Sequence, residues 1–311
     1  MTSQVIPRAR SAAPAGRVAG TPRRRRFRHS PWLYLAPALI LLITFTYVPV
    51  GNMLFYSFHK WDGLNPAMDP VGLDNYVRVF TDERYWRVFL ISLYYFAASF
   101  VQIAIALYFA VVLSFDVRFR NLFKGILFFP YLLNGVAVGF VFLYLFQPDG
   151  TLDTVLRLIG LGEHTQLWLG DPDIANFSLA GTSVWRFTGL NFVLFLGAIQ
   201  SIPGEIYEAA EVDGANRWHQ FRHIIAPGIR RIISLSFILA ISGSLSVFEI
   251  PFIMTGGANG TRTFVIQAYD TAFQFRQIGL ASAMAVVLLV IVLVLTWIQR
   301  RLLPDDEVTL S

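Results

Sequence analysis

Residues 278–298 read IGLASAMAVVLLVIVLVLTWI, and none of these 21 side chains is charged. An α-helix of about 20 mainly apolar residues is long enough to cross the hydrocarbon core of a bilayer. The stretch therefore predicts a membrane-spanning helix, and the rest of the chain has to be interpreted in a lipid setting.

The composition of the whole chain agrees with that setting. Of 311 residues, 55% are hydrophobic and only 14% are charged, whereas about 25% of the residues in a soluble domain are charged. So much apolar side chain must face lipid, which excludes a soluble enzyme and a disordered protein. Five further apolar runs are long enough to span a bilayer: 32–58, 89–115, 125–146, 179–202 and 232–253. We expect an all-α polytopic membrane protein with six transmembrane helices.

The basic residues predict the orientation of these spans, because cytoplasmic loops carry an excess of Lys and Arg. Seventeen of them lie before the first span or after the second, fourth and sixth, against seven in the other three loops. Both termini are therefore expected in the cytoplasm, as a basic, disordered tail 1–31 and a short tail 301–311 around a six-span domain 32–300. The formal charge of +5 then reflects topology and contact with anionic lipid, and no nucleic-acid partner is expected.

Cysteine and metal chemistry are not expected. The chain contains no Cys, so it has neither a reactive thiol nor a Cys metal site. The five His residues show no metal-ligand spacing; they are His29, His59, His164, His219 and His223. We assign no metal site.

The cytoplasmic loop 203–231 has the most distinctive pattern. Its sequence, PGEIYEAAEVDGANRWHQFRHIIAPGIRR, predicts a helix, a turn and a second helix. Gly214 favours a positive φ and so ends the first helix, Asp213 is suited to cap the second, and Pro227 ends that one. Ala209 and Ala210 give the first helix a face that another surface can approach closely. Such a hairpin either docks a partner or simply connects two spans.

The same loop resembles the EAA motif of the permeases of ABC importers. The family pattern is Glu-Ala-Ala, three residues, Gly, nine residues, Ile, one residue, Leu and Pro. The loop fits it in register with Glu208, Ala209, Ala210, Gly214, Ile224 and Pro227, and departs from it at Ala226, where Leu is usual. The resemblance implies that these residues, with Asp213, form the contact through which a separate ATPase drives transport.

Other segments resemble the carbohydrate-uptake permeases of maltose-like and glycerol-phosphate-like importers. They are Gly72–Tyr76 with Asp82 and Trp86 in the first outer loop, Phe119–Arg120, Phe129–Pro130 and Leu145–Gly150 around the third span, and Phe248–Gly257 at the end of the fifth. The last of these is similar to the first of the two permease subunits in such importers.

The resemblance implies a multi-pass subunit of the bacterial inner membrane that moves a sugar or sugar-like solute into the cytoplasm by alternating access. Its implied partners are a second permease, two cytoplasmic ATPase subunits and an extracytoplasmic solute-binding protein. The chain has no GxxxxGK[ST] segment to cradle phosphates, so we expect no enzyme activity and no cofactor in this chain, with ATP and Mg²⁺ on the ATPase. The alternative is a stand-alone, ion-coupled secondary transporter, which would need mid-membrane charges and internal symmetry.

Polar and aromatic side chains inside the spans are candidates for the substrate path, because polar groups in lipid are costly and usually functional. In the fifth span, Ser242, Ser246 and Glu249 recur at i, i+4 and i+7. The candidates in the third and fourth spans are Asn134, Tyr144, Trp185, Asn191 and Phe192. The alternative is that the serines bond their own helix backbone and the aromatic rings pack between helices.

Arg186 is the one basic residue inside a predicted span. We favour the interpretation that its side chain snorkels to the outer interface. The alternative is a gate formed by a salt bridge, with Glu249 as one candidate partner.

Overall fold

The computed structural model describes residues 31–115 and 117–302, which are mostly helical. They fall into two units, divided after Pro49, and each is described by itself. In the first unit, α1 (Pro31–Leu42) runs into a π-helical turn, η1 (Ile43–Tyr47), and then into α2 (Val48–Tyr56), which crosses the boundary. Together they provide a helix, Tyr34–Tyr56, that is long and apolar enough to cross a membrane. The predicted tails 1–31 and 301–311 lie almost wholly outside the described residues.

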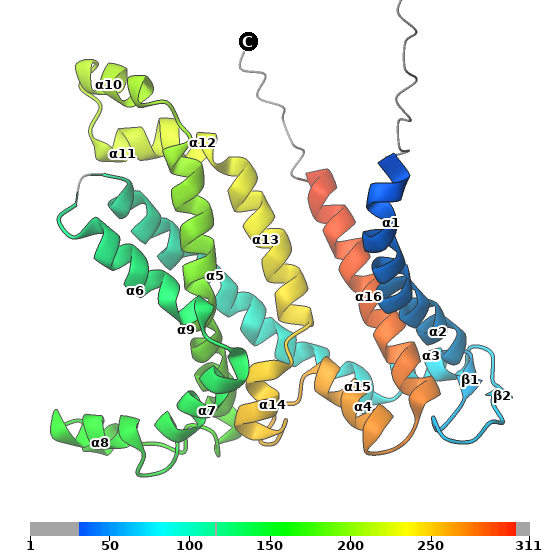
Figure 1. Ribbon diagram of the computed structural model, residues 1–311. Coiled ribbons are helices and arrows are strands. Elements are labelled where there is room, and N and C mark those ends of the chain that lie inside the picture. The colour runs from blue at the N-terminus through cyan, green and yellow to red at the C-terminus, as the bar shows by residue number, and fades with distance from the viewer. Residues whose placement is uncertain (1–30, 116, 303–311) are drawn as a thin grey trace, which may run out of the picture. The chain divides into compact units, whose positions relative to one another are not determined.

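The second unit, from Val50 onward, contains the remaining spans (Figure 1). Four further helical segments pass the length and hydropathy criteria for a span, and a bent pair makes up to six in the described part of the chain. The prediction of a polytopic helical membrane protein is therefore confirmed. The helices of these segments are α5 (Phe89–Ser114), α9 (Pro172–Gln200), α13 (Arg230–Leu245) with α14 (Glu249–Thr255), and α16 (Ile278–Leu302).

The third predicted span, 125–146, is not one straight helix. It consists of α6 (Arg120–Leu132) and α7 (Gly135–Leu145), which meet at an angle of 96°. Leu133 between them is extended, with φ −72° and ψ 142°. Asn134 then caps the new helix, since its side-chain oxygen accepts a hydrogen bond from the Val136 amide at 2.8 Å. The polar cap restarts the helix in another direction.

The fifth predicted span is also interrupted, between Leu245 and Glu249. Pro251 explains the break, because a proline lacks an N–H and its ring clashes with the carbonyl four residues earlier. That carbonyl belongs to Val247, and it accepts a hydrogen bond from the Thr263 hydroxyl at 2.7 Å instead. Ser242, Ser246 and Glu249 therefore do not form a stripe on one continuous helix, and that prediction is wrong.

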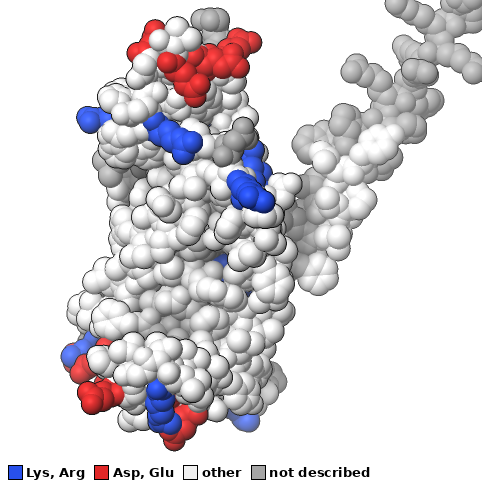
Figure 2. All heavy atoms as spheres, turned by 90° about the vertical axis from the view of Figure 1, so that its left-hand side faces the viewer, with Lys and Arg blue, Asp and Glu red and all other residues white. Residues whose placement is uncertain are grey.

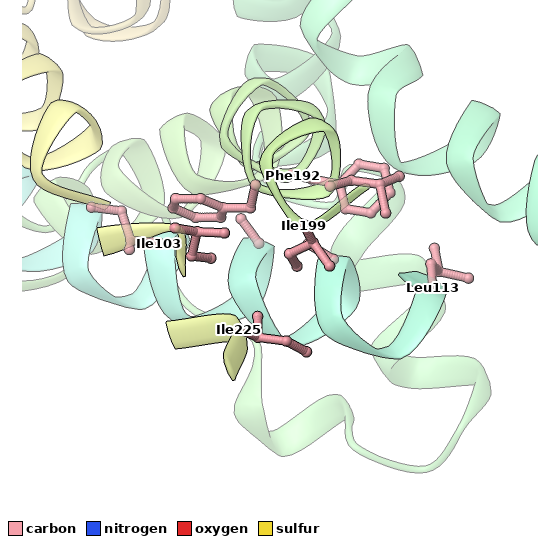
Figure 3. Close-up of a cluster of buried hydrophobic side chains, with 10 residues drawn as sticks. Ile103, Leu113, Phe192, Ile199 and Ile225 are labelled. Atoms are coloured by element: carbon pink, nitrogen blue, oxygen red, sulfur yellow. The ribbon is translucent and has the colours of Figure 1, made fainter. Parts of the chain in front are cut away.

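A buried cluster joins α5 and α9 to the end of the 203–231 loop (Figure 3). Ile103 and Leu113 come from α5, Phe192 and Ile199 from α9, and Ile225 from the π-helical turn η3 (Phe221–Ile225). Phe192 and Ile225 are fully buried. Apolar burial of this kind holds the loop to the spans.

Shorter elements lie at the two ends of the second unit. One end carries α10 (Gly204–Val212), α11 (Arg217–Gln220) and α12 (Ala226–Gly228), and the opposite end carries α8 (Thr151–Leu158) and α14 (Figure 1). The other short elements are β1 (His59–Lys60), its antiparallel partner β2 (Asp69–Pro70), α3 (Asp74–Thr81), α4 (Glu83–Trp86), the 3₁₀ turn η2 (Gly162–His164) and α15 (Phe264–Phe273). Figure 2 shows charged side chains gathered at both ends, with a broad surface nearly free of charge between them.

Candidate functional site

The turn after α10 is closed by two backbone hydrogen bonds. The Gly214 amide donates to the Glu211 carbonyl at 3.0 Å, and the Ala215 amide donates to the Ala210 carbonyl at 2.8 Å. This pattern is a Schellman motif, which requires the left-handed conformation at its central residue. Gly214 takes that conformation, with φ +78°, and nothing lies within 4 Å of where a Cβ would be. The prediction that Gly214 takes a positive φ and ends the first helix is therefore confirmed, and any cost of replacing it comes from the backbone.

The cap of the second helix is Asn216 and not Asp213. The Asn216 side-chain oxygen accepts a hydrogen bond from the His219 amide at 2.9 Å, while Asp213 occupies the C-terminal cap of α10. The Schellman turn adds residues between the two helices, so the cap of α11 lies three residues beyond the predicted one. Asp213 is left exposed at the turn.

Pro227 does not end the second helical segment either. The chain continues from α11 through η3 into α12, which contains Pro227 near its start, and breaks only at Ile229, where φ is −104°. The widened π-helical turn before the proline explains this continuity, because its hydrogen bonds do not need the missing amide.

The motif residues differ in exposure. Glu208, Ala209, Asp213, Gly214 and Pro227 are exposed, whereas Ala210 and Ile224 are half-buried. Apolar side chains are exposed beside them, Ile206 at 44%, Val212 at 88% and Trp218 at 63%. Acidic side chains gather around α10, as Figure 2 shows: Glu205, Glu208, Glu211 and Asp213. An apolar surface with a polar rim is typical of an interaction site.

The loop is fixed to the spans on its other side. Tyr207 of α10 and Phe221 of η3 pack against the buried cluster of α5 and α9. The Arg217 guanidinium lies 4.8 Å from the ring centre of Phe115, directly after α5, at the distance of a cation–π contact. Partial burial also raises the pKa of the Tyr207 hydroxyl. These contacts attach the loop to α5 and α9.

A cavity of about 460 Å³ lies within the second unit and is lined by residues of α5, α9, α13, α14 and the break before α14. Four of the predicted residues line it: Arg186, Asn191, Ser246 and Glu249. Its size falls in the range of small-molecule sites, about 300–1,000 Å³. The break before α14 contributes to the lining, so the interruption of the fifth span shapes this site.

The other predicted path residues lie elsewhere. Asn134 caps α7, and Tyr144 on the same helix is 62% exposed away from the lining. Trp185 packs against Phe142 with ring centres 5.1 Å apart. Phe192 is fully buried in the core, and Ser242 is not part of the lining.

Three polar lining residues from α5 were not predicted from the sequence: Tyr95, Ser99 and Gln102. A signal for them existed, because they are spaced i, i+4 and i+7 in an otherwise apolar span. Among the described residues, Tyr95 Oη, Asn191 Oδ1 and Arg186 Nε are buried without a hydrogen-bond partner. Such atoms are costly unless a solute or water meets them, so their presence around one cavity favours a binding site.

Arg186 forms an ion pair with Glu249 across α9 and α14, at 2.7 Å. The Arg186 side chain is 13% exposed and the Glu249 side chain 42%. The snorkelling that the sequence favoured is thus not what the structure shows. Gly135 of α7 lies against this pair, because a Cβ there would overlap the Glu249 carboxylate and the Arg186 guanidinium.

The part of the chain that the structure describes contains no group of three or more His, Cys, Asp or Glu side chains that could hold a metal ion.

Comparison with known proteins agrees with this architecture. Residues 102–305 match the family model described as the inner membrane component of binding-protein-dependent transport systems. The chain is 33% identical over 277 residues to the probable ABC transporter permease protein YurN of Bacillus subtilis, covering 87% of this chain and 94% of that protein. It is 31% identical over 280 residues to the multiple sugar-binding transport system permease protein MsmF of Streptococcus mutans, covering 89% and 96%.

A solved structure has a similar fold. It is a bacterial alginate ABC transporter in complex with an alginate pentasaccharide-bound periplasmic protein, with a TM-score of 0.75 and 21% identity, covering 88% of this chain and 93% of that one. With the spanning helices and the family match, these findings make the chain a multi-pass protein of the inner membrane.

Proposed function

The chain belongs to the family of inner membrane components of binding-protein-dependent transport systems, and from this premise we propose that its own substrate is a sugar. As the membrane component of an ABC importer it is a non-catalytic subunit, and a separate subunit hydrolyses ATP. The family argues against the alternative of a stand-alone, ion-coupled secondary transporter.

The lining of the cavity supports a sugar substrate. Hydroxyl and amide groups of Tyr95, Ser246, Asn191 and Gln102 can exchange hydrogen bonds with sugar hydroxyls, while Phe248 offers an apolar surface for the C–H face of a sugar ring. The names of the relatives point the same way, since MsmF belongs to a multiple sugar-binding system and the similar fold comes from an alginate transporter.

The partners and the topology are part of the same proposal. The excess of basic residues favours a cytoplasmic position for both termini and for α10 and α11. There, an ATPase subunit would receive the exposed surface of Glu208, Ala209, Asp213 and Gly214, and would supply the bound ATP and Mg²⁺. A second permease, a second ATPase subunit and an extracytoplasmic solute-binding protein complete the assembly.

Alternating access would then follow from the rigid connection between the loop and the core. Closure of the ATPase pair moves α10, and the buried cluster passes the motion to α5 and α9, two walls of the cavity. Rigid-body motion of packed helices is a common form of switching. The Arg186–Glu249 pair joins a third wall, α14, to α9, so breaking it would open the cavity on that side. We assign it the role of a gate.

The observation that carries this proposal is the exposed motif on α10 with its reverse side anchored in the core of the spans. The test is sugar uptake into proteoliposomes that contain the complete transporter. Uptake should require ATP on the side of the ATPase and a loaded binding protein, and should be unaffected by an ionophore that collapses ion gradients. Uptake driven by an ion gradient without ATP would contradict it.

A further inference from the structure

Helix α8 lies apart from both the cavity and the loop. It covers Thr151–Leu158 at the end of the second unit opposite α10. In Figure 1 it runs across the direction of α9 and not along it. A helix in this orientation cannot serve as a span, so its surface needs another explanation.

The side chains of α8 divide it into two faces. Leu152, Val155, Leu156 and Ile159 recur at i, i+3, i+4 and i+7, which places them on one side. Thr154 and Arg157 lie on the other side. Much of the apolar side is uncovered within this chain, since Val155 is 46% exposed and Ile159 63%. The following Leu161 is 44% exposed, and Leu158, four residues after Thr154, borders the polar side.

The orientation of these faces is fixed by a buried anchor. Asp153 is 3% exposed, and its carboxylate accepts hydrogen bonds from the Asp149 amide at 2.9 Å and from Trp168 Nε1 at 2.8 Å. Arg157 forms an ion pair with Asp149 on the polar side. Because these bonds prevent α8 from rolling about its axis, the apolar face is presented in one direction.

We propose that α8 is an interfacial helix, with its aliphatic face in the acyl-chain boundary and its polar side toward water and lipid headgroups. A short helix with a strong division between apolar and polar faces lies in the plane of the membrane, buried by about 5–10 Å. Figure 2 agrees with this position, since the charged side chains of this end lie at its margin and the surface toward the other end is nearly free of charge.

The composition of the face favours lipid over a protein partner. The exposed side chains of this face, Val155 and Ile159, are aliphatic, as is the following Leu161. Binding hot spots of protein interfaces are instead enriched in Trp, Tyr and Arg, and Leu and Val are under-represented. Arg157, the one arginine of the helix, points to the polar side, where a phosphate headgroup would be accessible. Lipid is therefore the occupant, independently of which solute is transported.

Site-directed spin labelling tests this position, and the absence of Cys in the native chain makes any introduced Cys unique within it. Val155→Cys and Ile159→Cys on the apolar side are compared with Thr154→Cys on the polar side. Each is labelled and reconstituted with the partner subunits into phosphatidylcholine–phosphatidylglycerol liposomes. Collision rates are then measured with oxygen, which concentrates in lipid, and with a water-soluble nickel chelate.

The expected result is an oxygen-to-nickel ratio several-fold higher at positions 155 and 159 than at 154. Equal ratios at all three positions would place the helix in water and overturn the proposal. Exclusion of both reagents at position 159 would also overturn it, because a protein partner would then cover the face. The readout does not depend on transport, so it stands apart from the proposed sugar substrate.

Discussion

Gly214 is the residue on which the shape of the α10 turn depends. Its φ of +78° costs a residue with a side chain about 1–2 kcal/mol, and a β-branched residue is the least suited to it. Gly214→Val should therefore distort the exposed motif and abolish ATP-driven uptake, while the amount of protein in the membrane stays unchanged. Gly204→Ala is the matched control, because Gly204 has open space around it and no positive φ. Normal uptake by Gly214→Val would remove the coupling role from this turn.

Gly189 of α9 provides a test of packing inside the membrane. A Cβ at this position would lie 2.6 Å from the Leu127 carbonyl oxygen and 3.0 Å from the Phe128 Cα. Both are backbone atoms of α6 and cannot rotate away, so Gly189→Ala should destabilise the protein by about 1–3 kcal/mol. Its melting temperature in detergent should fall. Gly197→Ala on the same helix meets nothing within 4 Å and should leave the melting temperature unchanged or higher.

Asp82, which caps α4, makes the local stability of that helix depend on pH. The Arg84 side chain, and then the Arg84 amide, donate hydrogen bonds to its carboxylate and hold the pKa of Asp82 below the ordinary value of 3.8. A lowered pKa in the folded state adds stability that is complete above the ordinary value and is lost as the pH falls through the folded value. Hydrogen exchange at the start of α4 should therefore accelerate below about pH 3.8. Asp82→Asn keeps a capping oxygen and should remove this acceleration; an unchanged pH profile would contradict the assignment.

At the scale of elements, the contact between α9 and α14 includes the ion pair of Arg186 and Glu249. Arg186→Glu or Glu249→Arg alone places like charges together at a site where the side chain of residue 186 is mostly buried and that of residue 249 is partly exposed, which is unfavourable. Each single reversal should lower uptake by on the order of tenfold, equivalent to about 1.4 kcal/mol. The double exchange should restore most of it, measured as the initial rate in proteoliposomes. If the double variant stays as inactive as the single ones, the pair is not the gate.

The spans could be predicted from the sequence because a helix that crosses lipid needs a long apolar run. The mean hydropathy of a window of about 20 residues detects such a run directly. The breaks depend on shorter signals. Pro251 has no N–H to donate to the Val247 carbonyl, which bonds Thr263 instead, and Asn134 caps α7. Both residues are visible in the sequence, but a mean hydropathy over about 20 residues does not reveal their effect. Asp213 was assigned to the wrong helix end for a related reason, since the Schellman turn lengthened the connection.

In the candidate site, too, one part could be predicted from the sequence and another could not. The α10 motif is local, so its residues and Gly214 could be identified along the chain. The cavity is formed where α5, α9 and the α13–α14 break converge, and the periodicity of one helix does not say which neighbour its polar stripe will face. Arg186 illustrates this, because its partner Glu249 lies 63 residues away.

At the scale of the whole molecule, the proposal requires the two ends of the second unit to face opposite sides of the membrane. Val212 of α10 is 88% exposed at one end, and Leu64 between β1 and β2 is 68% exposed. In a chain without native Cys, Val212→Cys and Leu64→Cys can each be probed with a membrane-impermeant maleimide. Leu64→Cys should react in right-side-out spheroplasts, and Val212→Cys only in inverted vesicles, because the basic loops stay in the cytoplasm. Reaction of both from the same side would reject the topology, and with it the docking of an ATPase on α10.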